Sequence, residues 1–173
     1  MKSRIFAFAA LLVVGCAHAP EHDPHKAHAV DPANTHDPEL QAVIAVHGGA
    51  GPWAVAGYQM GRYALQRLGL TRGSFDLEVV HDTPREVQYS CIADGAAAAT
   101  GASTGKLNLS LAEAPRAELH TVYRRRSNGA TISLRVTAAF AERFLNVPRE
   151  RLTDAGREVL HLRDDQIFEE VHE

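Results

Sequence analysis

The chain has 173 residues, with 18 Lys and Arg against 21 Asp and Glu, and its formal net charge is −3 at pH 7. A mildly acidic chain disfavours nucleic acid as a partner, because the phosphate backbone binds basic surfaces. The two cysteines are too few for an iron–sulfur cluster, which needs several thiolates.

The N-terminus has the pattern of a bacterial lipoprotein signal. Lys2 and Arg4 precede an apolar run over residues 5–14, which has the length of a secretory signal and is too short to span a bilayer. Gly15 and Cys16 follow aliphatic residues, as in a lipobox, so residues 1–15 are predicted to be a signal peptide and Cys16 to carry a diacylglyceryl group. The alternative is an ordinary cleaved signal with a cysteine there by chance.

Acylation of Cys16 predicts a protein held in the cell envelope, since two or three acyl chains anchor a protein stably where one does not. Ala17 follows the cysteine in place of the Asp that favours inner-membrane retention, so we expect the outer membrane, facing the periplasm, in a Gram-negative source. Without residues 1–15 the chain has 16 basic residues against 21 acidic ones, a net charge of −5.

Residues 16–37 are predicted to be a flexible tether. They are rich in His, Pro, Asp and Ala and show no apolar periodicity, so they cannot bury enough surface to offset the entropy of ordering. Two interpretations remain open: a soluble spacer, or a tract that collects loosely held metal ions. The tract contains five histidines: His18, His22, His25, His28 and His36.

Residues 38–173 suit one small α+β domain with a mixed or antiparallel sheet packed by helices. We expect helices over 38–46 and over 52–68, separated by a glycine-rich loop that starts at His47. In the second helix Gly57 and Gly61 lie one turn apart, which permits close packing against a neighbouring helix. We also expect a helix over 89–100, with Ser90 as its cap and Cys91 in its first turn.

Four strands are expected, over 75–80, 106–111, 118–126 and 130–136, with a turn over 81–84. The last two should form a hairpin with a two-residue turn at Asn128-Gly129, which would pair Arg126 with Thr131 and Tyr123 with Leu134. Tyr123 should then lie on the buried face and the run of three arginines over 124–126 on a solvated face, not in an anion site. Two more helices are expected over 138–145 and 149–160.

Two glycine-rich segments are similar to catalytic or phosphate-binding motifs. His47-Gly48-Gly49 is similar to an esterase oxyanion loop, but the chain has no G-x-S-x-G nucleophile elbow. Residues 101–106 are similar to a phosphate-binding loop, but the loop is one residue short and Leu107 replaces the magnesium-binding Ser or Thr. Neither an α/β-hydrolase nor a nucleotide-binding protein is therefore expected.

The order of motifs over residues 47–135 resembles the FmdE family, which takes its name from formylmethanofuran dehydrogenase. These motifs are His47-Gly48 before Pro52, then Gly57-Tyr58-Gln59-Met60-Gly61, then Cys91 before Asp94, and finally Gly101 through Gly105-Lys106-Leu107-Asn108-Leu109. The resemblance implies an α+β domain in which the first histidine and the cysteines hold a transition metal, most plausibly zinc.

The chain departs from the family pattern at the metal ligands. Gly49 stands in place of the second histidine, Gly51 in place of the motif cysteine and Trp53 in place of a glycine, which leaves His47 and Cys91 as family ligands. Two protein ligands rarely hold zinc tightly. His81, Asp82 or Asp94 could complete the set in space, and a degenerate pocket without metal is the alternative.

Three functional hypotheses follow. The first is a lipoprotein that binds a metal or small ligand in a pocket around His47 and Cys91, with candidate lining residues Trp53, His81, Asp94 and Lys106. The second is an enzyme in which His47 or His81 acts as general base, Cys91 as nucleophile or Asp94 as the group that orients the base. The third is an envelope scaffold without a working site. A homodimer formed through a sheet edge is also possible.

Overall fold

The computed structural model describes residues 37–172, so the predicted signal peptide, Cys16 and most of the tether lie outside the described residues. Within the described part of the chain, no helix is long and apolar enough to cross a membrane. The helices are α1 (Pro38–His47), α2 (Pro52–Leu68), α3 (Val87–Thr100), α4 (Ala138–Arg143), α5 (Leu152–Leu160) and α6 (Asp164–Ile167). The strands are β1 (Leu77–Thr83), β2 (Leu109–Glu113), β3 (His120–Arg125), β4 (Thr131–Val136) and β5 (Phe168–Glu170).

The five strands form one mixed sheet in the order β2-β1-β3-β4-β5. β1 pairs with β2 in parallel, and every other neighbour is antiparallel. α3 connects the two parallel strands, because a parallel pair needs a long crossover. The predicted α+β class with a mixed sheet is confirmed.

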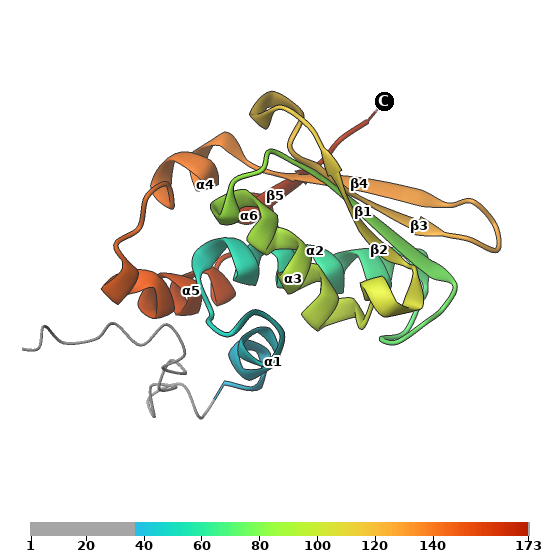
Figure 1. Cartoon of the computed structure of the whole chain (residues 1–173), viewed down its shortest axis with the longest axis horizontal. Helices are drawn as coiled ribbons and strands as arrows, with labels where there is room; N and C mark the ends of the chain where they lie inside the picture. The colour runs from blue at the N-terminus through green and yellow to red at the C-terminus, as the bar shows by residue number, and fades with distance from the viewer. Residues whose placement is uncertain (1–36, 173) are drawn as a thin grey trace, which may run out of the picture.

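The helices α2 and α3 pack against one face of the sheet, and α1 and α5 lie beyond them, below the strands in Figure 1. Alternation along β1 sends Leu77, Val79 and His81 into the core, where each is 0% exposed, and leaves Glu78 and Val80 partly exposed. The same period buries Tyr123 on β3 and leaves Arg124 exposed. One face of the sheet is therefore covered by helices, and the other, which carries Glu78, Val80 and Arg124, is partly open to solvent.

Packing of α2 on α3 depends on glycine, as the sequence predicts for Gly57 and Gly61. A Cβ on Gly57 would lie 2.1 Å from the carbonyl oxygen of Ile92, and one on Gly95 would lie 1.8 Å from that of Ala54. The two helix backbones therefore touch directly, and only hydrogen at these positions permits that approach.

Several predicted boundaries are wrong, each for a local physical reason. The strand expected to end at Val80 continues to Thr83, because His81 points into the core and does not belong to a turn. α3 begins at Val87 with Glu86 as its N-cap residue, so Ser90 is not the cap and Cys91 lies beyond the first turn. α6 and β5 form in the charged C-terminal segment, where no helix or strand is expected from the sequence.

The predicted hairpin between β3 and β4 is present, but its register is wrong by two residues. Arg124 pairs with Thr131 and Tyr123 with Ile132, so the connection is longer than the two residues predicted. The Arg125 amide donates to Ala130 O at 2.8 Å, and the Gly129 amide donates to Arg125 O at 2.9 Å. A shift of two residues preserves the side-chain alternation, so the predicted buried face of the hairpin is still correct.

Candidate functional site

A loop between α1 and α2 forms one wall of the site, and glycine shapes it. Gly48 ends α1 in the left-handed conformation, with φ of 81°, and its amide donates to Ile44 O. Gly51 is the N-cap residue of α2. Behind the loop, a Cβ on Gly156 of α5 would lie 1.8 Å from the carbonyl oxygen of Ala50, so α5 supports the loop through direct backbone contact.

The end of α1 and the middle of α3 bring His47 to Asp94. Nδ1 of His47 lies 2.8 Å from Oδ2 of Asp94, and the two side chains are 23% and 49% exposed. Cys91 is one helical turn before Asp94 on α3, and its thiol donates to Val87 O at 2.9 Å. The predicted neighbours His47, Cys91 and Asp94 thus form one cluster, although 47 residues separate His47 from Asp94.

The environment of His47 favours its charged form. A side-chain hydrogen bond with Cys91, followed in importance by one with Asp94, raises the pKa of His47 to about 9, although partial burial opposes the shift. The imidazole is therefore protonated near neutral pH.

Next to this cluster lies a pocket of about 580 Å³. Three of its walls are the end of α1 with the glycine loop, the first turn of α2 and the N-terminal part of α3, and the fourth is the chain from Phe144 to Thr153. Of the predicted site residues, His47, Trp53 and Cys91 line this pocket. Its volume is in the range of sites for small organic ligands.

Trp53 is a buried aromatic residue of the pocket lining. It is 4% exposed, its indole N–H donates to Phe144 O at 3.0 Å, and its ring contacts Tyr89 and Phe140 edge-on at 5.0 and 5.5 Å between centroids. Trp53 also lines a second hollow, of about 420 Å³. Trp53 is thus an immobilised aromatic surface and not a mobile gate.

Two other predicted pocket residues lie elsewhere. His81 is 0% exposed in the core, where its Nε2 donates to Tyr89 O at 3.2 Å and its Nδ1 accepts from the Thr121 hydroxyl at 2.8 Å. Burial lowers the pKa of His81, so it remains neutral and joins β1 and β3 to the start of α3. Lys106 belongs to a short 3₁₀ turn, where its ammonium donates to Gly101 O and lies over the ring of Phe75.

The donor set does not fit a resident zinc ion. Nδ1 of His47 is engaged by Asp94, which leaves one imidazole nitrogen and the Cys91 thiol, whereas structural zinc sites use four ligands and catalytic sites usually three. Over residues 37–172 no group of three or more His, Cys, Asp or Glu residues could hold a metal ion. Asp82, the other sequence candidate, lies beside His120 at 3.5 Å on the sheet.

Several pocket residues come from outside the recognised motifs and are not predicted from the sequence. Gln88 lies on α3, and Phe144, Val147, Arg149 and Leu152 come from a segment more than 90 residues after His47 in the chain. No spacing pattern joins these positions to the family motifs, because they meet only through the packing of α5 against the glycine loop.

Comparison with known protein families gives a match over most of the domain. Residues 46–169 match the family described as FmdE, Molybdenum formylmethanofuran dehydrogenase operon, and this match includes the pocket from His47 to Thr153. A search of curated proteins finds no match to the chain. Because the family match extends over more than half of the sequence, the chain belongs to the FmdE family.

Proposed function

We propose that this protein is an exported, lipid-anchored binding protein that holds a small ligand in the pocket beside His47. The observation that carries the proposal is the position of the charged His47–Asp94 pair and the Cys91 thiol at the edge of a pocket of about 580 Å³. Ligand sites are typically concave, mostly apolar and supplied with a few convergent polar groups. The export half of the proposal rests on the lipobox-like sequence before Cys16.

Binding can be tested with a neutral fluorescent probe, N-phenyl-1-naphthylamine, and the full chain carrying Cys16→Ser, which removes the lipid and so avoids detergent. Val87 lines the pocket and is 79% exposed, so Val87→Trp covers the opening without disturbing the core. Val46→Trp is the matched control, because Val46 is 47% exposed and is not among the lining residues. We expect saturable binding that Val87→Trp abolishes and Val46→Trp retains; equal binding in all three proteins would contradict the proposal.

Lipid anchoring has its own test. Cells are labelled with an alkyne analogue of palmitate, and the protein should carry label that is lost in Cys16→Ser. Label that persists in Cys16→Ser, or an absence of label in the unmodified chain, would contradict lipid anchoring. Neither result would affect the proposal that the pocket binds a ligand.

A second candidate is thiol-dependent catalysis, which the series Asp94–His47–Cys91 favours because a carboxylate holds a protonated imidazole beside a thiol, and a neighbouring cation stabilises the nucleophilic thiolate. Its test is the rate at which iodoacetamide alkylates Cys91 at pH 7 in the unmodified chain and in His47→Gln. Catalysis predicts a rate well above that of a free thiol and a loss of about tenfold in the variant. A slow rate that His47→Gln leaves unchanged would exclude an activated thiol.

A further inference from the structure

The loops that precede β1 and β2 meet at the hairpin end of the molecule and expose apolar side chains there. Phe75 on the first loop is 68% exposed, and Leu107 on the second is 84% exposed. The ammonium group of Lys106 lies 5.3 Å from the centre of the Phe75 ring, so the two loops contribute to one surface. We call Arg72, Phe75, Lys106 and Leu107 the tip patch.

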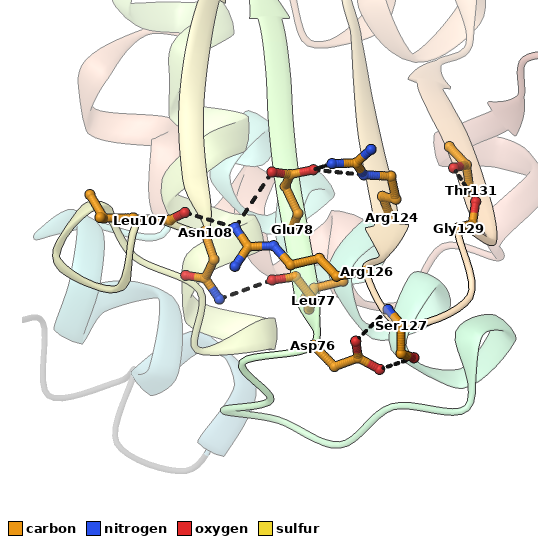
Figure 2. Close-up of polar contacts among 10 residues, drawn as sticks. All are labelled: Asp76, Leu77, Glu78, Leu107, Asn108, Arg124, Arg126, Ser127, Gly129 and Thr131. Carbon is orange, nitrogen blue, oxygen red and sulfur yellow. Dashed lines mark hydrogen bonds and ion pairs between the residues drawn. The ribbon is translucent and has the colours of Figure 1, made fainter.

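Backbone contacts hold the two loops of the tip patch together. The Gly73 amide donates to Thr100 O at 2.7 Å. The side chain of Asn108, which is 2% exposed, accepts from the Ser103 amide at 2.9 Å and donates to Leu77 O at 3.1 Å, and Figure 2 shows the second bond. The exposed side chains therefore project from a braced surface.

Leu107 is an exposed side chain from which the isolated domain gains little. Its φ of 53° lies in the left-handed region, which favours glycine, and its side chain has almost no burial in return. Burial of the leucine against a partner would offset the cost of this conformation, because removing apolar surface from water is favourable. The position therefore suits a surface that becomes covered.

The tip patch also has two cations that no described carboxylate neutralises. Arg72 and Lys106 each donate to a backbone carbonyl, and neither is bonded to a carboxylate among residues 37–172. The carboxylates that follow Phe75 in the chain, Asp76 and Glu78, are engaged by the hairpin arginines. Exposed apolar groups beside free positive charge match an anionic phospholipid bilayer, which has hydrocarbon beneath a negative surface.

The predicted anchor would bring the domain to such a surface. Residues 17–36 separate Cys16 from the described domain, and twenty residues span at most about 70 Å. A compact domain of this size has a radius of gyration of about 14 Å, so this length lets any of its faces reach the bilayer. The anchor alone therefore leaves the orientation of the domain open, and even a weak patch can set it.

We propose that the tip patch docks on the anionic phospholipid bilayer in which Cys16 is anchored. Phe75 and Leu107 enter the interfacial layer, and the two cations lie against lipid phosphates. This inference rests on the proposed lipid anchoring and adds the face that the domain turns toward the membrane.

Docking at the tip leaves the pocket accessible. α2 begins at Pro52, which lines the pocket, and ends at Leu68, after which the loop of the tip patch begins. In Figure 1 the hairpin of β3 and β4 lies at one end of the molecule and α4 and α5 lie at the other. Seventeen residues of helix measure about 25 Å, so the pocket would lie about that far from the bilayer and open to the aqueous phase.

The test is flotation of the Cys16→Ser full chain, which carries no lipid, with two kinds of vesicle. One contains equal parts of phosphatidylethanolamine and phosphatidylglycerol, and the other contains phosphatidylcholine alone. We expect binding to the anionic vesicles that high salt weakens, and at least about tenfold weaker binding to the neutral ones, because each of two cations contributes about fivefold. No binding to either kind, or equal binding to both, would overturn the proposal.

Variants of the tip patch locate the contact. Leu107→Gly should weaken binding to the anionic vesicles by about tenfold, and it relieves the left-handed conformation, so unfolding cannot explain the loss. Lys106→Gln should weaken binding by about fivefold.

Each variant of the patch has a matched control elsewhere on the surface. Val46→Ser changes an apolar residue on α1 that is 47% exposed. Arg85→Gln removes a cation that is 85% exposed and lies just after the other end of β1. We expect both controls to bind as the Cys16→Ser chain does, and losses equal to those of the patch variants would contradict docking at the tip.

Self-association and anchoring are tested separately. Sedimentation velocity without vesicles should give a monomer, and a dimer that Leu107→Gly dissociates would assign the patch to a second copy of the chain and overturn docking. If palmitate labels Cys16 but the Cys16→Ser chain binds no vesicles, the anchor stands and docking is wrong. If Cys16 is unlabelled and the Cys16→Ser chain binds, docking stands and the anchor is wrong.

Discussion

The two ends of the molecule treat polar side chains in opposite ways. At the hairpin end the arginines are paired: Arg124 and Arg126 both bond to Glu78, and Arg125 bonds to Asp76. Figure 2 shows Arg126 also donating to the carbonyl of Leu107, at 2.8 Å. At the pocket end the described lining has no carboxylate, His47 is paired with Asp94 outside that lining, and the remaining lining is mostly apolar.

This difference explains why the three-arginine run is structural although it is the more conspicuous charge cluster in the sequence. Its charges are neutralised by carboxylates on β1 and in the segment before it. Asp76 accepts from the amide and hydroxyl of Ser127, both at 2.7 Å, and these bonds, with that from Arg125, lower the pKa of Asp76. Matched polar groups hold the hairpin and leave no cavity there for a ligand to fill, whereas at the pocket end the His47–Asp94 pair lies at the edge of a cavity.

The largest expected effect comes from Gly95, whose contact with Ala54 sets the position of α3 and therefore of Cys91 and Asp94. Gly95→Ala places a Cβ 1.8 Å from a backbone oxygen, so we expect it to lower the free energy of unfolding by about 3 kcal/mol or more. Urea denaturation measures this loss. Gly105→Ala is the control, because a Cβ there meets nothing within 4 Å, and a similar loss in that variant would contradict the packing argument.

The next effect is on the ionisation of His47. Because the pKa is raised to about 9 from 6.5, protonated His47 stabilises the fold below pH 6.5, and this stabilisation is lost as the pH rises from 6.5 through 9. Titration of the imidazole by NMR should give a high pKa that Cys91→Ala lowers more than Asp94→Asn does, since the Cys91 bond is the larger cause. A titration near 6.5 in the unmodified chain would show that the cluster is not formed in solution.

At the hairpin end, Leu107 offers a smaller effect of opposite sign. It has φ of 53° and is 84% exposed, so it adopts a left-handed conformation with almost no burial in return. Leu107→Gly should stabilise the protein by about 1 kcal/mol, because glycine adopts this conformation without steric cost. Thermal unfolding measures the change, and Leu107→Ala, which keeps the Cβ, should not reproduce it.

The smallest effect is expected for the charge pair on the sheet surface. Arg124 is 52% exposed beside Glu78, and exposed ion pairs contribute at most about 1 kcal/mol. A double-mutant cycle of Arg124→Ala and Glu78→Ala should therefore give a coupling energy below that value, falling further in high salt. Loss of ligand binding in either single variant would contradict the separation of the two ends.

Local patterns predicted the parts of the fold that depend on neighbouring residues. Pro52, the helical spacing of apolar residues and Gly69 predict a helix over residues 52–68, and α2 has the same bounds in the structure. The predicted hairpin register is wrong, because it depends on a contact that local sequence does not reveal. Asp76 accepts a hydrogen bond from the Ser127 amide in the turn, 51 residues later in the chain. His81-Asp82-Thr83-Pro84 fits a turn pattern in the sequence. No local pattern indicates that His81 is buried and bonded to Thr121, which lies 40 residues away.

The candidate site likewise contains some residues that local motifs predict and others that only long-range packing brings in. The family motifs identified His47, Cys91, Trp53 and Asp94, because each lies within or beside a recognisable pattern. Gln88 and Arg149 have no such signal, since their place in the pocket follows from the packing of α3 and α5 around the glycine loop.

The most direct test is an NMR titration of the ¹⁵N-labelled Cys16→Ser full chain with N-phenyl-1-naphthylamine, followed at every backbone amide. We expect saturable shifts confined to residues 44–54, 87–91 and 144–153, with the hairpin over residues 124–131 unchanged. Shifts concentrated on the hairpin arginines, or none at the pocket, would contradict the claim that the pocket end is the binding end of this protein.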